Sequence, residues 1–450
     1  MHKTISLFFL LALTLIQEAF PQESINLLVR ISTEKYPEVR ARQLETAAAQ
    51  RELSYQKADI TPQLNASYQA NYATANNITG MFMPGQVLPI SGPPSLENSA
   101  QMVYGSAAAL LLNWSPLTFG KRQSRVNTAQ AELEFSKANE ELAILDHQIK
   151  FIHAYLDFWA MTAKVNALEK NMERYRFNLE LSRSLVINGL RPGVDSSQFN
   201  SLFIKSKLEL LQGQREMESY RTLVRELLGD DDVTIPVDQR LGNQTARLPS
   251  STNTLHPLIQ SSQQQTAIAQ YQKTQISRSL LPDLNFWGTG FARGSAILAD
   301  GTFEAPTEGL SFSRYNYGLG FQVTVPVFQF AQTRQRIKRQ DYLVEASKAR
   351  EETIYRGLEK DRIVAQVTFD KALETAELAP DYVQAAQYSF DALQARYDAG
   401  LINMAELLQG QATLAEAEAE VIKAKAEMWK ALLYQAAVQG EISVFTQNFE

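Results

Sequence analysis

The sequence predicts a mixed α and β membrane protein that contains an internal duplication. Three observations predict this class: residues that recur at constant offsets in the two halves, segments that alternate between apolar and polar side chains, and very long stretches of helix-forming residues. Alternation with a period of two indicates strands whose faces meet different media, and long runs without Pro or Gly indicate helices. A repeat of this size indicates two equivalent structural units.

The duplication is marked by turn-forming residues. Tyr36 corresponds to His256 at an offset of 220 positions, and each precedes a proline; Gly189 corresponds to Gly400 at an offset of 211. The difference places a longer loop between the two strands of the first half, at 73–101, where four Pro and three Gly predict irregular structure. We therefore expect five segments: a signal peptide at 1–19, a first repeat at 20–229, a linker at 230–253, a second repeat at 254–440 and a C-terminal tail at 441–450.

The expected signal peptide consists of Lys3, an apolar run at 5–16 and the small residue Ala19. This pattern is typical of a secretory signal, and the run is too short to cross a bilayer as a helix. Export of the protein is the consequence.

Composition excludes several classes of function. The chain contains no Cys, which excludes disulfides, thiolate metal sites and a lipid-modified N-terminal cysteine. The net charge of -6 is spread over interspersed acidic and basic residues, so no nucleic-acid partner is expected. His147 and His153 lie six positions apart, which is not the spacing of a zinc pair on a helix, and Met81 with Met83 is weak evidence for metal capture. No cofactor or metal is expected, and no nucleotide-binding or nucleophile motif indicates an enzyme.

Four strands are expected, two in each half. The residues from Leu64 to Tyr72 and from Tyr315 to Val325 alternate most clearly, with apolar and aromatic side chains opposite amides, hydroxyls and glycines. The segment from Met102 to Trp114 and the one containing Gly288 supply the others. Any one of them could be an ordinary strand with one solvated face, but four of about 10 to 13 residues are long enough to cross a bilayer when tilted.

Long helices follow each strand pair. Residues 121–188 contain neither Pro nor Gly, which predicts a helix of about 100 Å. Heptad-like spacing of apolar residues along it indicates a coiled coil. The further helices are expected at 24–60, 195–228, 332–399 and 406–439, and their lengths allow two short helices, stacked end to end, to lie beside each long one.

Four strands cannot close a barrel, and lipid does not tolerate an open sheet edge, so the chain is expected to oligomerise. Two copies give 8 strands and a filled interior, whereas three give 12 strands with room for a lumen. The strand count alone leaves both numbers open.

The order of these elements, together with the segment Tyr397-Asp398-Ala399-Gly400 before a helix that carries Glu406, resembles the TolC family of outer-membrane efflux channels. The resemblance extends over residues 24–440. It implies a homotrimer whose 12-stranded β-barrel lies in the outer-membrane lipid of a Gram-negative bacterium and continues into a long α-helical coiled-coil tunnel in the periplasm. It also implies a passive exit duct, gated at its periplasmic tip, of a tripartite efflux pump or a type I secretion system. The implied partners are a periplasmic membrane-fusion adaptor and an inner-membrane pump of the RND or ABC type.

The resemblance also implies the gate residues. Aligned on the glycine turn, the tyrosine of the family's constriction is Tyr397, its arginine position is occupied by Ile402, and its two acid positions by Glu406 and Gln409, while the acid of the first repeat is Asp195. Ile402 is not a cation and Gln409 is not an acid, so the family's network is incomplete here.

Structural interpretations compete with the gate. Asn403 and Glu406 have the spacing of a helix capping box, Asp195 suits a helix N-terminus, and Tyr397 suits packing between helices. Three copies of Glu406 around an axis would instead repel one another and attract cations. The expected adaptor contacts are the turns that contain Asn188, Gly189, Leu190, Arg191, Ala399, Gly400, Leu401 and Asn403.

Two other functions remain open. A periplasmic coiled-coil scaffold or adaptor without a pore explains the helices but not the paired amphipathic strands. An exported enzyme requires a polar constellation that the sequence does not contain.

Overall fold

A computed structural model describes residues 25–74, 76, 82–83, 86–87, 97–189, 192–230, 235–249, 255–298 and 300–449. The expected signal peptide lies outside these residues. The described residues form two compact units, one within 25–48, 134–265 and 347–449 and the other within 49–133 and 266–346. Each unit combines segments from both halves of the sequence. No helix in the described part of the chain has the length and apolarity needed to cross a membrane.

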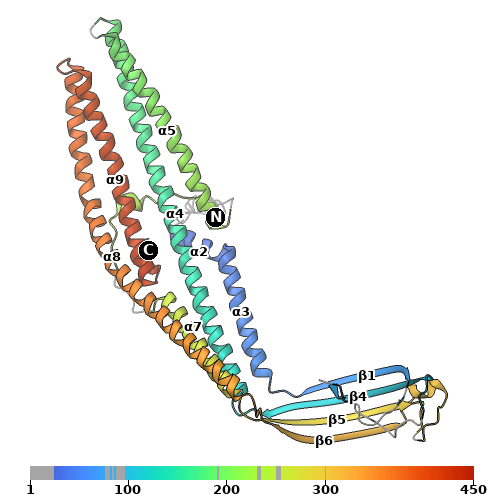
Figure 1. The fold of residues 1–450 in the computed structure, drawn as a ribbon. Helices are drawn as coiled ribbons and strands as arrows, with labels where there is room; N and C mark the ends of the chain where they lie inside the picture. The colour runs from blue at the N-terminus through green and yellow to red at the C-terminus, as the bar shows by residue number, and fades with distance from the viewer. Residues whose placement is uncertain are drawn as a thin grey trace, which may run out of the picture. The chain divides into compact units, whose positions relative to one another are not determined.

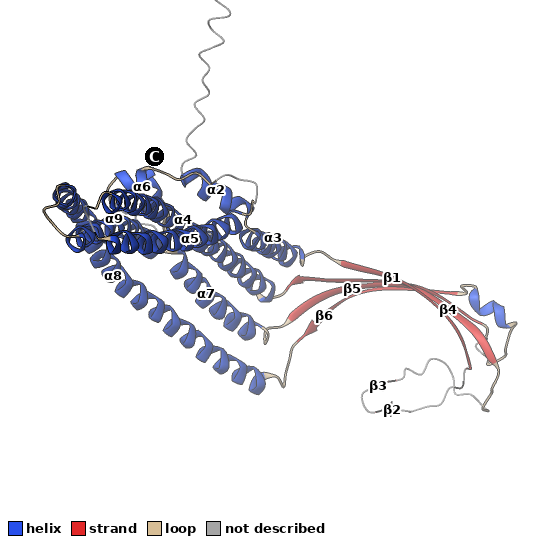
Figure 2. Cartoon of the chain, turned by 90° about the horizontal axis from the view of Figure 1, so that it is seen from above, coloured by secondary structure: helices blue, strands red, loops and turns tan. Residues whose placement is uncertain are grey.

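The second unit contains an antiparallel sheet of four strands in the order β1-β4-β5-β6 (Figure 1). The strands are β1 (Gln63–Thr74), β4 (Met102–Leu117), β5 (Asp283–Ser295) and β6 (Arg314–Thr324). Figure 2 shows that the sheet is curved. The predicted strands are confirmed, with one correction: the long loop of the first half, expected to be irregular, contains the two-residue strands β2 (Phe82–Met83) and β3 (Gln86–Val87).

The sheet has two unlike faces. Residues paired directly across strands point to the same side, so the register defines each face. The first, the apolar face, is largely aliphatic and aromatic and comprises Leu64, Ala66, Tyr68, Ala70, Tyr72, Leu110, Leu112, Trp114, Leu284, Phe286, Ala292, Tyr315, Tyr317, Leu319, Phe321 and Val323. The opposite one, the polar face, includes Asn65, Ser67, Gln69, Asn113, Asn285, Trp287, Thr289, Arg293, Arg314, Asn316 and Gln322.

Along β6, the described part of the chain leaves the apolar face uncovered. Its five side chains on that strand, Tyr315 to Val323, are 64 to 92% exposed. Monomeric soluble proteins rarely leave a contiguous apolar surface of this kind in water. The fold therefore requires another apolar phase against this face.

The long helices are α4 (Lys121–Ile187) and α8 (Phe330–Asp398), as predicted. The shorter ones are α2 (Ile25–Lys35), α3 (Pro37–Ala58), α5 (Gly193–Leu228), α7 (Pro257–Arg278) and α9 (Met404–Gln439). One prediction is wrong: residues 24–60 form two helices rather than one. Tyr36 interrupts them because the residue before a proline is disfavoured in helical conformation, and Pro37 suits the first position of a new helix.

The first unit has a core around Trp429 of α9, which is fully buried. Its indole Nε1 donates to the carbonyl of Leu241, in the short helix α6 (Arg240–Asn243) of the linker, at 2.8 Å. Its ring contacts Phe445 in α10 (Ser443–Thr446) and Phe449 in the 3-10 helix η2 (Gln447–Phe449). The linker and the C-terminal tail are thus anchored on the helical core.

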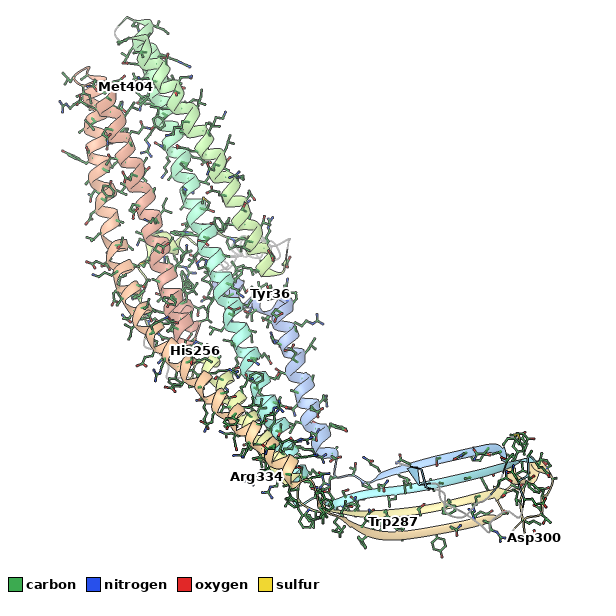
Figure 3. All side chains as sticks on the ribbon, in the orientation of Figure 1. Tyr36, His256, Trp287, Asp300, Arg334 and Met404 are labelled. Atoms are coloured by element: carbon green, nitrogen blue, oxygen red, sulfur yellow. The ribbon has the colours of Figure 1, made fainter. Side chains whose placement is uncertain are left out.

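In each half, the helix that ends the repeat approaches a short helix near the start of the same repeat, and a glycine marks the contact. Gly229 ends α5 with φ +69°, and a Cβ there would lie 3.3 Å from Lys35; Gly440 ends α9 with φ +80°, and a Cβ there would lie 2.9 Å from Pro257. Both positions favour glycine, because L side chains rarely adopt the left-handed conformation and a Cβ would lie close to the neighbouring helix. Tyr36 and His256, labelled in Figure 3, occupy the equivalent junctions.

His256 joins α7 to the end of α9. Its Nδ1 accepts from the Leu258 N–H at 3.0 Å, which assigns the proton to Nε2, and Nε2 donates to the Ala437 carbonyl at 3.0 Å. The other buried histidine of the helical core, His147, stacks on Tyr36 with ring centroids 3.9 Å apart. His256 therefore serves capping and His147 serves packing.

Stability is expected to fall with acidification through these histidines. Burial lowers the pKa of both His256 and His147 below the ordinary value of 6.5. Below pH 6.5 the unfolded chain binds more protons than the folded chain, so acidification lowers the free energy of unfolding. The contribution of these histidines to stability is fully present above about pH 6.5, and it declines until the pH falls below their folded-state pKa values. Chemical unfolding at pH 7.5 and pH 5.5 should show this decline, and it should shrink in a variant carrying both His256→Gln and His147→Gln. An undiminished decline in that variant would assign the effect to other groups.

Candidate gate and adaptor-contact site

The turn between α8 and α9 ends the second repeat's helical hairpin. Gly400 has φ +73°, and its N–H donates to the Tyr397 carbonyl at 3.0 Å, while the Leu401 N–H donates to the Arg396 carbonyl at 2.8 Å. This pair of bonds is the Schellman motif, which satisfies the last carbonyls of the helix. Helix α9 begins four residues later at Met404, labelled in Figure 3. The backbone of the turn is therefore fixed by its own hydrogen bonds.

The corresponding turn of the first repeat follows α4. Gly189 has φ +69° and donates to the Val186 carbonyl at 3.0 Å, and Asn188 donates through its backbone and its side chain to the Ser184 carbonyl. Leu190 and Arg191, predicted as adaptor contacts, lie outside the described residues. The exposed residues of the second turn are Ala399, Gly400, Leu401 and Asn403.

Tyr397 and Ile402 are brought together in a buried cluster of α4, α5, α8 and α9. Tyr397 is fully buried, and its ring meets that of Phe199 edge-on at 6.4 Å between centroids. Ile402 is 6% exposed in the same cluster. Within the chain, Tyr397 therefore packs between helices, as one of the two interpretations predicts. The apolar side chain of Ile402 suits this buried environment, whereas a cation at that position would need a buried partner.

Glu406 and Gln409 remain on the exposed side of α9. The predicted capping interaction is confirmed: the Glu406 N–H donates to Asn403 Oδ1 at 3.0 Å, and Asn403 Nδ2 donates to Glu406 Oε1 at 3.0 Å. The second bond uses the side-chain amide of Asn403 instead of the backbone N–H of a capping box. One carboxylate oxygen of Glu406 thus accepts a hydrogen bond from Asn403, while the carboxylate as a whole remains exposed to solvent.

Asp195 is not the N-terminal cap that the sequence suggested. Pro192 occupies the cap position of α5, without a side-chain hydrogen bond, and Asp195 lies in the first turn. There its carboxylate favours the positive end of the helix dipole. Among the described residues, no hydrogen bond or ion pair joins Asp195 to Glu406.

Polar contacts between α4 and α9 were not predicted from the sequence. Gln411 is fully buried, accepts from Asn178 Nδ2 at 3.1 Å, and donates to Asn171 Oδ1 at 3.2 Å. Farther along, Arg174 pairs with Glu418. Asn171 and Asn178 are one heptad apart on α4, a spacing that would have indicated two polar positions on one helical seam. These contacts tie the hairpin of one repeat to that of the other.

The fold and this site define a class of protein. A sheet with an exposed apolar face, continued by paired long helices that end in two glycine turns, is the architecture of an outer-membrane channel with a helical extension. A profile of the outer membrane efflux protein family matches residues 28–230 and 248–436. The chain belongs to this family. It is an outer-membrane efflux protein that extends into the periplasm, and it acts as a channel and not as an enzyme.

Solved structures share this fold at low sequence identity. The chain is similar to the channel protein CusC, with a TM-score of 0.76, 12% identity and coverage of 94% of this chain and 93% of that chain. It is similar to the outer membrane protein VceC from Vibrio cholerae, with a TM-score of 0.73, 14% identity and coverage of 93% and 96%. The open state of the Neisseria gonorrhoeae MtrE outer membrane channel gives a TM-score of 0.73, 15% identity and coverage of 93% and 89%. No curated protein sequence is significantly similar to the chain.

Proposed function

We propose that three copies of this chain form the passive exit duct of a tripartite efflux pump or a type I secretion system. The apolar face of the sheet carries this proposal, since its side chains on β6 are 64 to 92% exposed and require lipid. Both edge strands, β1 and β6, are also unpaired in the described part of the chain. Three copies supply 12 strands, enough to surround an aqueous lumen lined by the polar face.

Exposed apolar side chains on the helices support a ring of copies. Leu208 and Leu211 are exposed on α5, and Leu378 and Tyr388 are exposed on α8. These are two different surfaces, so pairing one with the other is a head-to-tail contact, which closes into a ring when the rotation permits. A scaffold without a pore would leave both the helical surfaces and the apolar face of the sheet in water.

The duct depends on partners for energy and for substrate. A periplasmic membrane-fusion adaptor would contact the exposed turns around Gly189 and Gly400, and an inner-membrane pump of the RND or ABC type would deliver the solute. These partner roles are inferred for this chain from its family membership. They are consistent with two glycine turns whose backbone is held by local hydrogen bonds. The described residues of these turns that are exposed are Asn188, Gly189, Ala399, Gly400, Leu401 and Asn403.

Disulfide trapping tests the ring. The chain contains no Cys, so introduced cysteines are unique. In an antiparallel closure, β1 of one copy pairs with β6 of the next. Ser67→Cys combined in turn with Asn316→Cys or Gln322→Cys should yield oxidised species up to a covalent trimer in outer-membrane fractions. Ser67→Cys alone is the control. Absence of any crosslink between copies, or a limit at the dimer for every pair, would contradict the trimer.

Glu406 supplies the proposed gate charge. Three copies around the axis place like charges in a narrow throat, which attracts cations and makes multivalent cations block the closed channel. Glu406→Gln is expected to weaken that block by on the order of tenfold in planar bilayers. Because the substitution leaves an oxygen that can accept from Asn403, the start of α9 should be preserved. Unchanged conductance together with unchanged block would show that Glu406 has only its capping role.

A further inference from the structure

We propose that Arg293 and Arg314 form an anion-attracting collar on the polar face of the sheet, which favours solutes that carry carboxylate or phosphate groups. The inference rests on the proposed trimeric duct and concerns the opposite end of the sheet from the long helices. The two residues stand directly opposite each other in the register of β5 and β6. They therefore project to the same side of the sheet.

The distribution of charge along the strands singles out this pair. The four long strands contain only three charged residues, Asp283, Arg293 and Arg314. Asp283, at the helix end, pairs with Lys121 at 2.6 Å. Among the described residues, no carboxylate forms an ion pair with Arg293 or Arg314, and both side chains are exposed. Arg293 and Arg314 therefore carry the only charges on these strands that lack an ion-pair partner among the described residues, and they lie at the same height along the sheet.

Direct juxtaposition of two like charges destabilises a sheet. A strand pair that needed only solubility could carry an amide at either position, as it does at Asn316 and Gln322. An anion between the two guanidinium groups removes the repulsion, because each group presents a planar set of donors that matches a carboxylate or a phosphate. The arrangement therefore matches the charge and the hydrogen-bonding geometry of a negative group.

The loop between β5 and β6 leaves this side open. It folds against the other face: Ser106, which lies on the apolar side of β4, donates to the Gly309 carbonyl at 2.9 Å, and Phe312 contacts the ring of Tyr68. A Cβ on Gly294, which points to the same side, would lie 2.1 Å from the Ser311 carbonyl oxygen. In Figure 3 Asp300 marks this loop at the end of the sheet. The neighbouring residues of the row on the polar face, Gln69 and Ala107, add no charge.

In the trimer the pair becomes a ring. Two arginines from each chain give six at one level of the lumen, and rings of arginine or lysine are how pores select anions. The lumen of a 12-stranded barrel is wide, so the effect depends on ionic strength. At about 0.01 M salt the Debye length of about 30 Å lets the collar act across it, whereas at about 1 M salt the length of about 3 Å does not.

The test uses the full chain in planar bilayers of zwitterionic lipid, at low and at high KCl. Three proteins are compared: the wild type, a double variant with Arg293→Gln and Arg314→Gln, and a charge-retaining double variant with Arg293→Lys and Arg314→Lys. Each is also made with Glu406→Gln, which removes the acidic ring proposed at the other end. At low salt the glutamine variant is expected to lose anion preference, with a fall on the order of threefold in the chloride-to-potassium permeability ratio. The lysine variant should resemble the wild type, and the difference should vanish at high salt.

Inorganic pyrophosphate provides a second readout. Added to the side of the sheet's loops, it should reduce the conductance of the wild type and the lysine variant more than that of the glutamine variant. Equal permeability ratios and equal block in all three proteins would overturn the collar while leaving the duct intact. Absence of channels from the wild type would overturn the proposed duct and the collar together. Arginine-dependent retention of phosphate-bearing lipid during purification, with no effect of pyrophosphate, would assign the pair to lipid headgroups and also overturn it.

Discussion

Leu319→Arg is expected to abolish assembly of the protein in the outer membrane. Leu319 lies in the middle of β6 on the apolar face and is 73% exposed within the chain. A lipid-facing arginine near the middle of a bilayer costs about 2–4 kcal/mol per subunit. In the proposed trimer, in which three subunits share one barrel, the cost is about three times as large. Heat-dissociable oligomer on unheated gels, and its recovery in outer-membrane fractions, should both fall to a small fraction of wild type.

The same strand offers a matched control. Asn316 lies three residues away on the polar face, and Asn316→Arg introduces the same side chain at a solvated position. We expect this variant to assemble with little loss. If Leu319→Arg assembles as well as Asn316→Arg, the apolar face does not contact lipid, and the proposed orientation of the sheet is wrong.

Trp429→Ala should give the largest loss of stability in the helical unit. The indole is fully buried, contacts Phe445 and Phe449, and donates to the Leu241 carbonyl at 2.8 Å. Truncation of a buried aromatic side chain costs about 3–5 kcal/mol, through lost burial and the cavity left behind. It also releases the linker and the C-terminal tail from their common anchor. The midpoint of urea unfolding of the detergent-solubilised protein, followed by near-ultraviolet circular dichroism, measures the loss.

Trp429→Phe separates packing from hydrogen bonding. It retains an aromatic ring but leaves the buried Leu241 carbonyl without its donor, at a cost of about 1–3 kcal/mol. We expect this loss to be smaller than that of Trp429→Ala. Equal losses in the two variants would show that the hydrogen bond, and not the packing of the ring, holds the linker in place.

The local elements were predictable because their signals are local. The helix expected at 121–188 is observed at Lys121–Ile187, since nothing interrupts it before Gly189 takes the left-handed conformation. Strand β6 was evident from alternation alone, because a sheet between lipid and water leaves each side chain one of two environments. The break at Tyr36 was missed because helix-forming composition on both sides outweighed the effect of a single proline.

The candidate site was predictable only in part. The turns and the Asn403–Glu406 interaction depend on residues within five positions of each other, which sequence spacing can reveal. The burial of Tyr397 and Ile402 depends on four helices that are distant in sequence. The contact of Gln411 with Asn171 and Asn178 likewise joins residues more than 200 positions apart. No local pattern specifies which helical faces meet.

The sequence determined the duplicated order of helices and strands, the turns, and the two-faced character of the sheet, since each follows from periodicity and from the backbone preferences of Pro and Gly. The tertiary structure decided how those parts combine. It mixed both halves in each compact unit, placed the linker and tail on Trp429, and set Arg293 opposite Arg314. These features depend on the register of strands and the packing of helices, which arise from contacts between residues far apart in the chain.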